Sequence, residues 1–301
     1  MNRKDLLGLR DLTAEEILAI VDEGAKIKAR LKKGEKQFSD LKGKSAVTLF
    51  YENSTRTRCS FDLAAKNLGA NVVNLDVAGS SVQKGETLID TGRTLDMQQN
   101  DFIVIRHSAS GAPKLLAKNV KAHVINAGDG MHEHPTQALL DFLTMKEACG
   151  KIEGLTVAIL GDISHSRVAK SNLYGLTKLG AKVKMYAPRT LMPARIDEMG
   201  ATICSSREAA LENADVVMGL RIQLERQKAG NFPSLGEYAK YYGVDDAVLK
   251  AAKPNAVVMH PAPVNRGVEL TSSVIDGAQS LIEEQVFSGL AVRMAIFKAL
   301  L

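Results

Sequence analysis

The sequence lacks the features that mark nucleic-acid-binding, membrane-spanning and disulfide-stabilised proteins. Aromatic residues make up 5% of its 301 residues and tryptophan is absent, so no series of aromatic side chains is available for stacking on bases. No apolar run approaches the roughly 18 residues that span a bilayer, and the start, MNRKDLLGLRDL, has no apolar core of signal-peptide length. The three cysteines, Cys59, Cys149 and Cys204, are far apart and in no metal-ligand spacing. We therefore expect a cytoplasmic protein with no membrane or nucleic-acid partner.

The composition that remains is that of an ordinary globular protein with a mild excess of positive charge. Hydrophobic residues make up 45% of the chain and charged residues 24%, and 301 residues are enough for two domains with separate cores. The net charge is +5 and the basic residues are spread along the chain rather than clustered. This distribution favours small anionic ligands over nucleic acid.

Short apolar segments alternate with helix-like segments along the whole chain. This alternation predicts an α/β fold in which parallel sheets are covered on both faces, arranged as two doubly wound domains. Because ligands of such sheets bind at the carboxyl ends of the strands, and polar residues follow strands in both halves, we expect the active site in the cleft between the two domains. The pattern restarts after Gly150, which places a boundary near residues 147–154, and the helical segment 281–301 could close either domain. The expected strands are residues 45–51, 71–75, 101–105, 122–126, 155–160, 183–186, 201–204, 215–220 and 256–259.

The most informative stretch is Ser54-Thr55-Arg56-Thr57-Arg58, between the strand at 45–51 and a helix expected over 60–68. The exposed N–H groups at a helix start favour an anion, and arginine can fork two donors onto phosphate oxygens. The stretch lacks the glycines and lysine of a P-loop. Five consecutive phosphate-competent side chains exceed what a helix cap needs, so we predict a phosphate-binding site.

Other polar residues follow the remaining strands. Ligands of open α/β sheets bind at the carboxyl ends of the strands, and four arginines are expected there, which indicates a ligand with several negative charges. The groups are Arg106, His134 with Gln137, residues 162–167, Arg221 with Gln223, and residues 260–263.

Metal and dinucleotide sites are disfavoured. His132-Glu133-His134 is one residue short of the H-E-x-x-H spacing and has no evident third ligand. Gly161-Asp162 follows a strand, but the G-x-G-x-x-G pattern of a dinucleotide fold is absent. We expect neither a metal ion nor another cofactor.

Three motifs resemble those of the carbamoyltransferases in order and spacing: the Ser54-to-Arg58 stretch, His134-Pro135-Thr136-Gln137 and His260-Pro261-Ala262-Pro263. The resemblance covers essentially the whole chain. Lys84-Gly85-Glu86-Thr87 and Arg221-Ile222-Gln223 are similar to the aspartate branch. The ornithine branch is the alternative, but it typically carries His-Cys-Leu-Pro, and Arg167 and Arg221 suit a dicarboxylate better than a cationic amino acid. A non-catalytic sensor of phosphorylated metabolites would not need His134 beside a second anion pocket.

The resemblance implies that carbamoyl phosphate donates its carbamoyl group to the α-amine of L-aspartate, in de novo pyrimidine biosynthesis. It assigns residues 1–147 with 285–301 to carbamoyl-phosphate binding and residues 148–284 to aspartate binding. It also implies a homotrimer in which Lys84 and a loop serine, Ser80 or the neighbouring Ser81, come from the adjacent subunit. Regulatory chains or a dihydroorotase stay open as further partners.

The resemblance also implies a role for each site residue. The catalytic residues would be Arg56, Thr57, Arg106 and His134. Aspartate would be bound by Lys84, Arg167, Arg221 and Gln223. Carbamoyl phosphate would be bound by Ser54, Thr55, Arg56, Thr57, Arg106, His134 and Gln137, together with the backbone carbonyls of Ala262 and Pro263.

Overall fold

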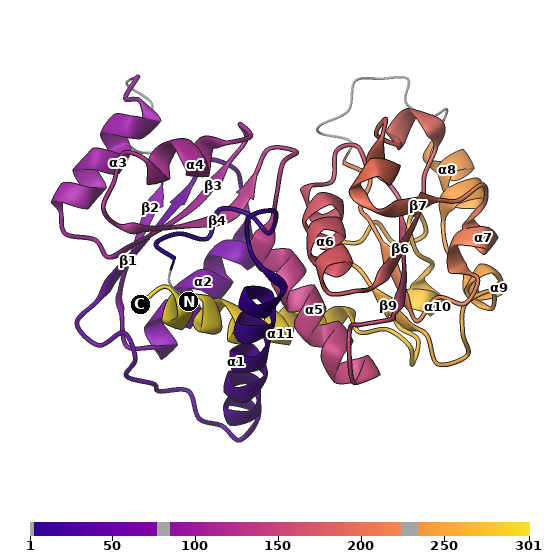
Figure 1. Cartoon of the computed structure of the whole chain (residues 1–301), viewed down its shortest axis with the longest axis horizontal. Helices are drawn as coiled ribbons and strands as arrows, with labels where there is room; N and C mark the ends of the chain where they lie inside the picture. The colour runs from indigo at the N-terminus through magenta and orange to yellow at the C-terminus, as the bar shows by residue number, and fades with distance from the viewer. Residues whose placement is uncertain (1–2, 77–84, 224–233) are drawn as a thin grey trace. The chain divides into compact units, whose positions relative to one another are not determined.

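A computed structural model describes residues 3–76, 85–223 and 234–301, and the chain divides into two compact units (Figure 1). The first unit comprises residues 1–143 and 287–301, and the second comprises residues 144–286. The chain passes from one unit to the other within α5 (Pro135–Cys149) and again within α11 (Ile282–Ala299). The sequence placed these boundaries after residues 147 and 284. The structure places them after residues 143 and 286.

The first unit is built on a parallel four-stranded sheet in the order β2-β1-β3-β4. Leu6 extends this sheet, because it forms a parallel bridge with Ile125 on β4. The strands are β1 (Ser45–Phe50), β2 (Asn71–Asp76), β3 (Phe102–His107) and β4 (His123–Asp129). The helices before α5 are α1 (Ala14–Lys32), α2 (Thr55–Asn67), α3 (Leu88–Met97) and α4 (Ala112–Ala117).

Helices cover both faces of this sheet because alternate strand residues point to opposite sides. On one face, Val47 and Ile103 pack with Leu95 of α3 and Leu116 of α4. On the other face, the Phe297 ring of α11 lies 5.1 Å from the Phe102 ring and 5.9 Å from that of Phe61 on α2. The C-terminal helix therefore completes the core of the first unit.

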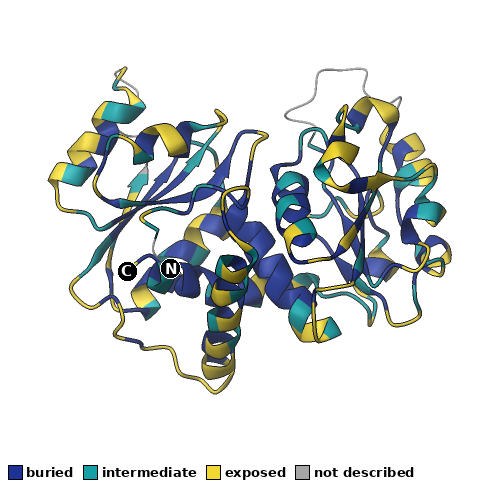
Figure 2. Cartoon of the chain, viewed as in Figure 1, coloured by how far each residue is buried: buried dark blue, intermediate teal, exposed yellow. Residues whose placement is uncertain are grey.

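The second unit contains a parallel five-stranded sheet in the order β7-β6-β5-β8-β9. One face packs against α7, α9 and α10. The inner strands β1, β3, β5 and β8 are buried almost throughout, whereas the edge strands β2 and β7 carry exposed residues, as do the outer helix faces and loops (Figure 2). The strands are β5 (Thr156–Leu160), β6 (Lys182–Tyr186), β7 (Ala201–Ile203), β8 (Val216–Gly219) and β9 (Val257–Met259). The helices are α6 (Arg167–Lys178), α7 (Arg207–Leu211), α8 (Leu235–Tyr242), α9 (Asp246–Leu249) and α10 (Ser272–Ile275), with 3₁₀ turns at Arg189–Leu191 and Ile196–Met199.

Each sheet reverses its strand order once, and such a switch point is where open α/β sheets bind ligands. In the first unit the reversal lies between β1 and β3, which are followed by the Ser54-to-Arg58 stretch and by Arg106 at the end of β3. In the second unit it lies between β5 and β8, which lead to residues 162–167 and to Arg221 with Gln223. The topology thus places predicted site residues at the switch point of each sheet.

The predicted α/β class with two parallel-sheet domains is confirmed. The main local error concerns α2, which begins at Thr55 rather than near Ser60, because a polar Thr-Arg-Thr-Arg turn has no apolar period to reveal it. The short α4 and α10, of six and four residues, were not predicted. Within the described residues, no helix combines the length and hydropathy needed to cross a membrane.

A close backbone approach after β5 should make Gly161 essential for stability. It has φ +132°, and an added Cβ would lie 2.6 Å from the Leu220 carbonyl oxygen. Gly154 also has positive φ (+79°), but it faces open space. We expect Gly161→Ala to lower the free energy of unfolding by roughly 3 kcal/mol or more, and Gly154→Ala by only about 1–2 kcal/mol. Urea unfolding followed by circular dichroism would measure both, and equal losses would contradict the prediction.

Candidate functional site

The predicted phosphate-binding stretch forms the first turn of α2. Ser54 is the N-cap, and its carbonyl oxygen accepts the Arg58 N–H at 3.1 Å, but its side chain makes no capping hydrogen bond. The first turn contains no acidic residue. Thr57 is buried, whereas Thr55 and Arg56 are exposed. The positive end of the helix is therefore reinforced by arginine and not neutralised within the turn, which suits an anion.

Arg106 lies beside this turn because β3 pairs with β1. Phe50 is the register partner of Arg106, and the Tyr51 N–H donates to the Arg106 carbonyl oxygen at 2.9 Å. The Arg106 Nε lies 3.2 Å from Glu52 Oε2, with the two side chains 15% and 19% exposed. The Glu52 carboxylate thus lies beside the Arg106 guanidinium at the carboxyl edge of the sheet, and Glu52 immediately precedes the α2 turn in the sequence.

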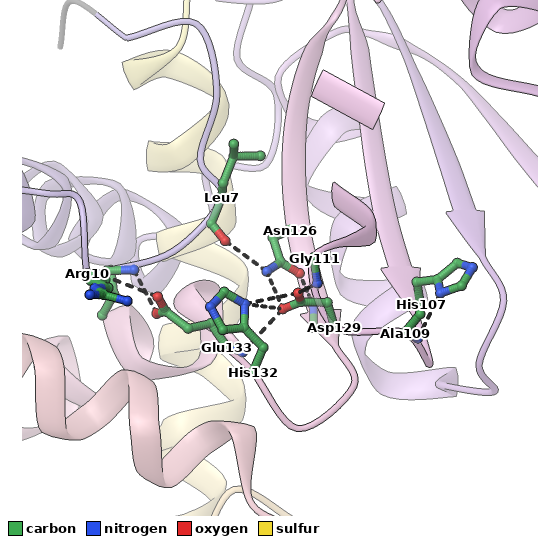
Figure 3. A network of polar contacts seen from close by, with 11 residues as sticks. Leu7, Arg10, His107, Ala109, Gly111, Asn126, Asp129, His132 and Glu133 are labelled. Carbon is green, nitrogen blue, oxygen red and sulfur yellow. Dashed lines mark hydrogen bonds and ion pairs between the residues drawn. The ribbon is translucent and has the colours of Figure 1, made fainter. Parts of the chain in front are cut away.

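The turn that carries His134 is organised around the buried carboxylate of Asp129 (Figure 3). This carboxylate accepts the Gly111 N–H at 2.6 Å, the Asn126 side-chain amide at 2.8 Å and the Glu133 N–H at 3.2 Å, and His132 Nδ1 lies 3.0 Å away. Burial acts to raise the pKa of Asp129, but the hydrogen bonds, led by that from His132, outweigh it and hold the pKa below its ordinary value.

Glu133, the residue directly before His134, is held by the N-terminal segment. Its buried carboxylate accepts the N–H groups of Leu9 at 2.7 Å and Arg10 at 3.3 Å, and a Cβ on Gly8 would collide with Glu133 Oε1. Two residues of the His132-Glu133-His134 triplet are therefore bonded to other parts of the protein: Glu133 to the N-terminal segment and His132 to Asp129. Over the described ranges, no three His, Cys, Asp or Glu side chains are grouped as metal ligands.

Gln137 lies in the first turn of α5, and its amide orientation follows from its partner. The amide nitrogen donates to the Asp141 carboxylate at 2.9 Å, and both side chains are buried. Since a carboxylate only accepts, the Gln137 oxygen points away from Asp141 and can accept another hydrogen bond. Behind this pair lies Arg293 of α11, which donates to the Ser60 hydroxyl of α2 at 3.0 Å. Burial lowers the pKa of Arg293 to about 10, with the charge of Asp141 opposing that change.

In the second unit, Arg167 is the first residue of α6 and is buried. The preceding Ser166 caps the helix by accepting the Ala169 N–H at 3.1 Å. The buried Asp162 carboxylate accepts the His165 N–H at 3.1 Å and lies 2.8 Å from His165 Nδ1. These bonds fix the loop between β5 and α6. Arg167 directly follows this loop, as the first residue of the helix.

The second unit also presents Arg221 and Gln223 after β8, and the loop 260–263 after β9. Ala262 has φ +50°, in the left-handed region that favours glycine, and its N–H donates to His260 Nδ1 at 2.9 Å. The His260 N–H donates to Gln285 Oε1 at 2.9 Å. The backbone of this loop is therefore held in place, and its carbonyl groups are the polar groups that Ala262 and Pro263 can present.

The structure thus collects the predicted residues into one set at the carboxyl edge of each sheet, while Ser80 and Lys84 lie outside the described residues. The first unit holds Ser54, Thr55, Arg56, Thr57, Arg106, His134 and Gln137, and the second holds Arg167, Arg221, Gln223, Ala262 and Pro263. The sequence prediction missed three buried acids: Asp129 and Glu133 in the first unit, and Glu269 in the second unit, whose carboxylate accepts the N–H groups of Ile222 and Asn265. The Gly128-Asp129-Gly130 turn was the available signal for the first of these.

Family models match both parts of the chain. Residues 4–147 match the aspartate/ornithine carbamoyltransferase carbamoyl-P binding domain. Residues 153–300 match the aspartate/ornithine carbamoyltransferase Asp/Orn binding domain. Two similar proteins are the aspartate carbamoyltransferase catalytic subunits of Acetivibrio thermocellus, 61% identical, and Ruminiclostridium cellulolyticum, 59% identical. Each alignment covers 98% of this chain and 95% of the relative.

Solved structures of both branches are similar to this fold. Aspartate transcarbamoylase from Trypanosoma cruzi, in complex with N-(phosphonacetyl)-L-aspartic acid, has a TM-score of 0.90 at 33% identity, with 99% of this chain and 95% of that chain covered. Ornithine carbamoyltransferase from Pyrococcus furiosus has a TM-score of 0.87 at 32% identity, with 97% and 95% covered. Backbone similarity alone therefore does not separate the two branches.

The lowered pKa of Asp129 makes a pH prediction. A carboxylate whose pKa is depressed on folding adds stability that is present above its unfolded pKa and is lost as the pH falls through the folded value. We expect Asp129→Asn to lower the free energy of unfolding by roughly 1–3 kcal/mol at pH 7. The difference from the unmodified protein should shrink below about pH 4.

Urea unfolding over a series from pH 7 to pH 3 would measure this difference, with Asp11→Asn as the control because Asp11 is exposed. A difference for Asp129→Asn that stayed constant across the series would contradict the prediction.

Proposed function

We propose, because the chain belongs to the aspartate/ornithine carbamoyltransferase family, that it transfers the carbamoyl group of carbamoyl phosphate to L-aspartate. The α-amine of aspartate attacks the carbonyl carbon, a C–N bond forms, and the bond from that carbon to the phosphate oxygen breaks. The products are N-carbamoyl-L-aspartate and phosphate, the former an intermediate of de novo pyrimidine biosynthesis. The departing phosphate can accept the proton that the amine loses.

The observation that carries this proposal is the start of α2. It is a helix N-terminus with arginine and hydroxyl side chains, no acidic residue in its first turn, a Ser54 side chain that makes no capping hydrogen bond, and Arg106 alongside. Ser54, Thr55, Arg56 and Thr57 would hold the phosphate, together with Arg106. Thr57, Arg106 and His134 would direct donors at the carbonyl oxygen as negative charge develops on it. Each such donor contributes about 3–4 kcal/mol to transition-state stabilisation.

The carbamoyl NH₂ needs acceptors, and three are proposed. They are the Gln137 amide oxygen, which points away from Asp141 because the amide nitrogen bonds to that carboxylate, and the backbone carbonyls of Ala262 and Pro263. The chemistry is then carried by positioning and electrostatic stabilisation, with no cofactor or metal ion. Orientation of two bound reactants can contribute roughly 7–11 kcal/mol.

Aspartate, rather than ornithine, is the proposed acceptor. Arg167, Arg221 and Gln223 would bind its two carboxylates, with Lys84 contributing. The full-length similarity to aspartate carbamoyltransferase catalytic subunits supports this choice, as does the absence of a cysteine from His260-Pro261-Ala262-Pro263. Ornithine or a related amino acid is the alternative acceptor.

We further propose a homotrimer in which Lys84 and Ser80 act in the site of the neighbouring subunit. Two exposed apolar residues of the first unit support a contact between subunits: Val73 on the edge strand β2, 51% exposed, and Leu63 on α2, 47% exposed. Regulatory chains or a dihydroorotase are further partners to be tested against the trimer. The cytoplasm is the proposed compartment, supported by the three cysteines being free thiols.

The direct test supplies carbamoyl phosphate with either aspartate or ornithine and measures phosphate release and the carbamoylated product. We expect turnover with aspartate and not with ornithine. Arg56→Ala should reduce kcat by roughly 100-fold or more, because it removes a cationic donor to the phosphate, on which negative charge grows as it departs, while the protein stays folded. Arg30→Ala is the matched control, since Arg30 is an exposed α1 residue paired with Glu35. Turnover with ornithine alone would overturn the proposal.

Sharing of sites between subunits has its own test. Arg56→Ala and Lys84→Ala proteins should each be nearly inactive. After subunit exchange, some sites would combine an intact Arg56 from one chain with an intact Lys84 from another, so part of the activity should return. Native mass measurement would follow the exchange. Confirmed exchange without any recovery would argue against shared sites.

A further inference from the structure

We propose that Glu269 is a positioning residue that holds the backbone of residues 221–223 in register with the loop that carries Ala262 and Pro263. This assignment depends on the proposed function, because it concerns the predicted aspartate-binding residues and the predicted carbamoyl acceptors. Glu269 would not touch substrate. It would act through the backbone of both segments.

Glu269 is 3% exposed, and its carboxylate accepts three hydrogen bonds. Oε1 accepts the Ile222 N–H at 2.9 Å and the Asn265 side-chain amide at 2.7 Å, and Oε2 accepts the Asn265 N–H at 2.8 Å. Its own carbonyl oxygen accepts the Val244 N–H at 3.0 Å. One buried side chain therefore joins two segments that are 47 and 4 residues away from it in sequence.

The position of Ile222 explains why this contact matters for the site. Ile222 is fully buried, whereas Arg221 and Gln223 on either side of it are half-buried. Fixing the Ile222 N–H thus fixes the backbone from which both predicted aspartate-binding side chains project. At the other end, Asn265 lies two residues after Pro263, and β8 and β9 are adjacent parallel strands with Met218 opposite Met259. The bridge therefore spans the carboxyl ends of two neighbouring strands.

A carboxylate is chemically required at this point. All three partner groups are N–H donors, so both oxygens must accept, which an amide of the same shape cannot do. Burial raises the pKa of Glu269, while the bonds from Ile222 and Asn265 oppose the rise. Burying an ionised group is unfavourable for stability compared with an apolar side chain of similar volume. Its presence here is explained by the register that it imposes on the two segments.

The same unit offers a matched control at the opposite end of β8. The Asp215 carboxylate accepts the Thr156 N–H at 2.8 Å and lies 2.6 Å from Lys253 Nζ. Asp215 precedes β8, whereas Ile222 follows it. Asp215→Asn therefore perturbs a carboxylate-to-backbone contact in the same sheet, but at the edge away from the predicted site residues.

The experiment compares Glu269→Gln with Asp215→Asn in the full chain, by steady-state kinetics and thermal unfolding. We expect Glu269→Gln to raise the KM for aspartate roughly 10- to 100-fold and to lower kcat, since small misplacements of binding groups have effects of this size. Its affinity for inorganic phosphate, which probes the α2 turn of the other unit, should stay unchanged. Asp215→Asn should leave the KM for aspartate unchanged, even if it lowers Tm by as much as Glu269→Gln does.

Two further variants keep the test decisive. Asn265→Ala removes one of the three hydrogen bonds and should raise the KM for aspartate, but by less than Glu269→Gln does. This variant also tests the inference if Glu269→Gln does not fold. Combining Glu269→Gln with Gln223→Ala should give less than the product of the two separate effects, because both act through one segment. An aspartate KM unchanged in both Glu269→Gln and Asn265→Ala would overturn the inference. Failure of the unmodified protein to use aspartate would instead overturn the proposed function.

Discussion

Both units face one electrostatic constraint: arginine side chains must be held at the carboxyl edge of a parallel sheet before any anionic ligand arrives. The strands deliver these residues automatically, because parallel strands all end at the same edge. Like charges gathered there repel one another, so each arginine needs either a local partner or access to water. Arg106 has Glu52 at 3.2 Å, whereas Arg56 lies exposed in the first turn of α2. The arrangement keeps positive charge available without burying it unpaired.

The acids near these edges serve a different purpose from the arginines. Asp129, Glu133, Asp162 and Glu269 are all buried, and each accepts at least one backbone N–H from a loop that follows a strand or from the N-terminal segment. A loop backbone has many N–H groups that no strand or helix satisfies, and a carboxylate can accept several of them at once. The buried carboxylates thus accept hydrogen bonds from the backbone. These bonds fix the conformation of the loops that bear the cationic residues.

The sequence predicted the features that are local and missed those that are not. Continuous apolar segments such as residues 101–105 identify buried parallel strands without any tertiary information, and the residues after them were therefore placed at the correct edge. The start of α2 at Thr55 was missed because the polar Thr-Arg-Thr-Arg turn has no apolar period to mark it as helix. The contacts of Glu133 with Leu9 and of Glu269 with Ile222 join residues 124 and 47 positions apart. Nothing in the local pattern of a glutamate distinguishes such a partner from water.

The choice of amino-acid substrate depends on side chains and not on the fold, because the aspartate and ornithine branches share the same two-unit backbone. A second carboxylate on the acceptor amino acid needs a second cationic group in the site. Such a site discriminates strongly against an acceptor that lacks this carboxylate, since the cationic group is then left unpaired. Under the proposed function, Arg221 would meet this need only if its backbone is held where the carboxylate would lie. Specificity for a dicarboxylate would then reside partly in residues that never contact it. Glu269 is such a residue, because it accepts the N–H of Ile222, which directly follows Arg221.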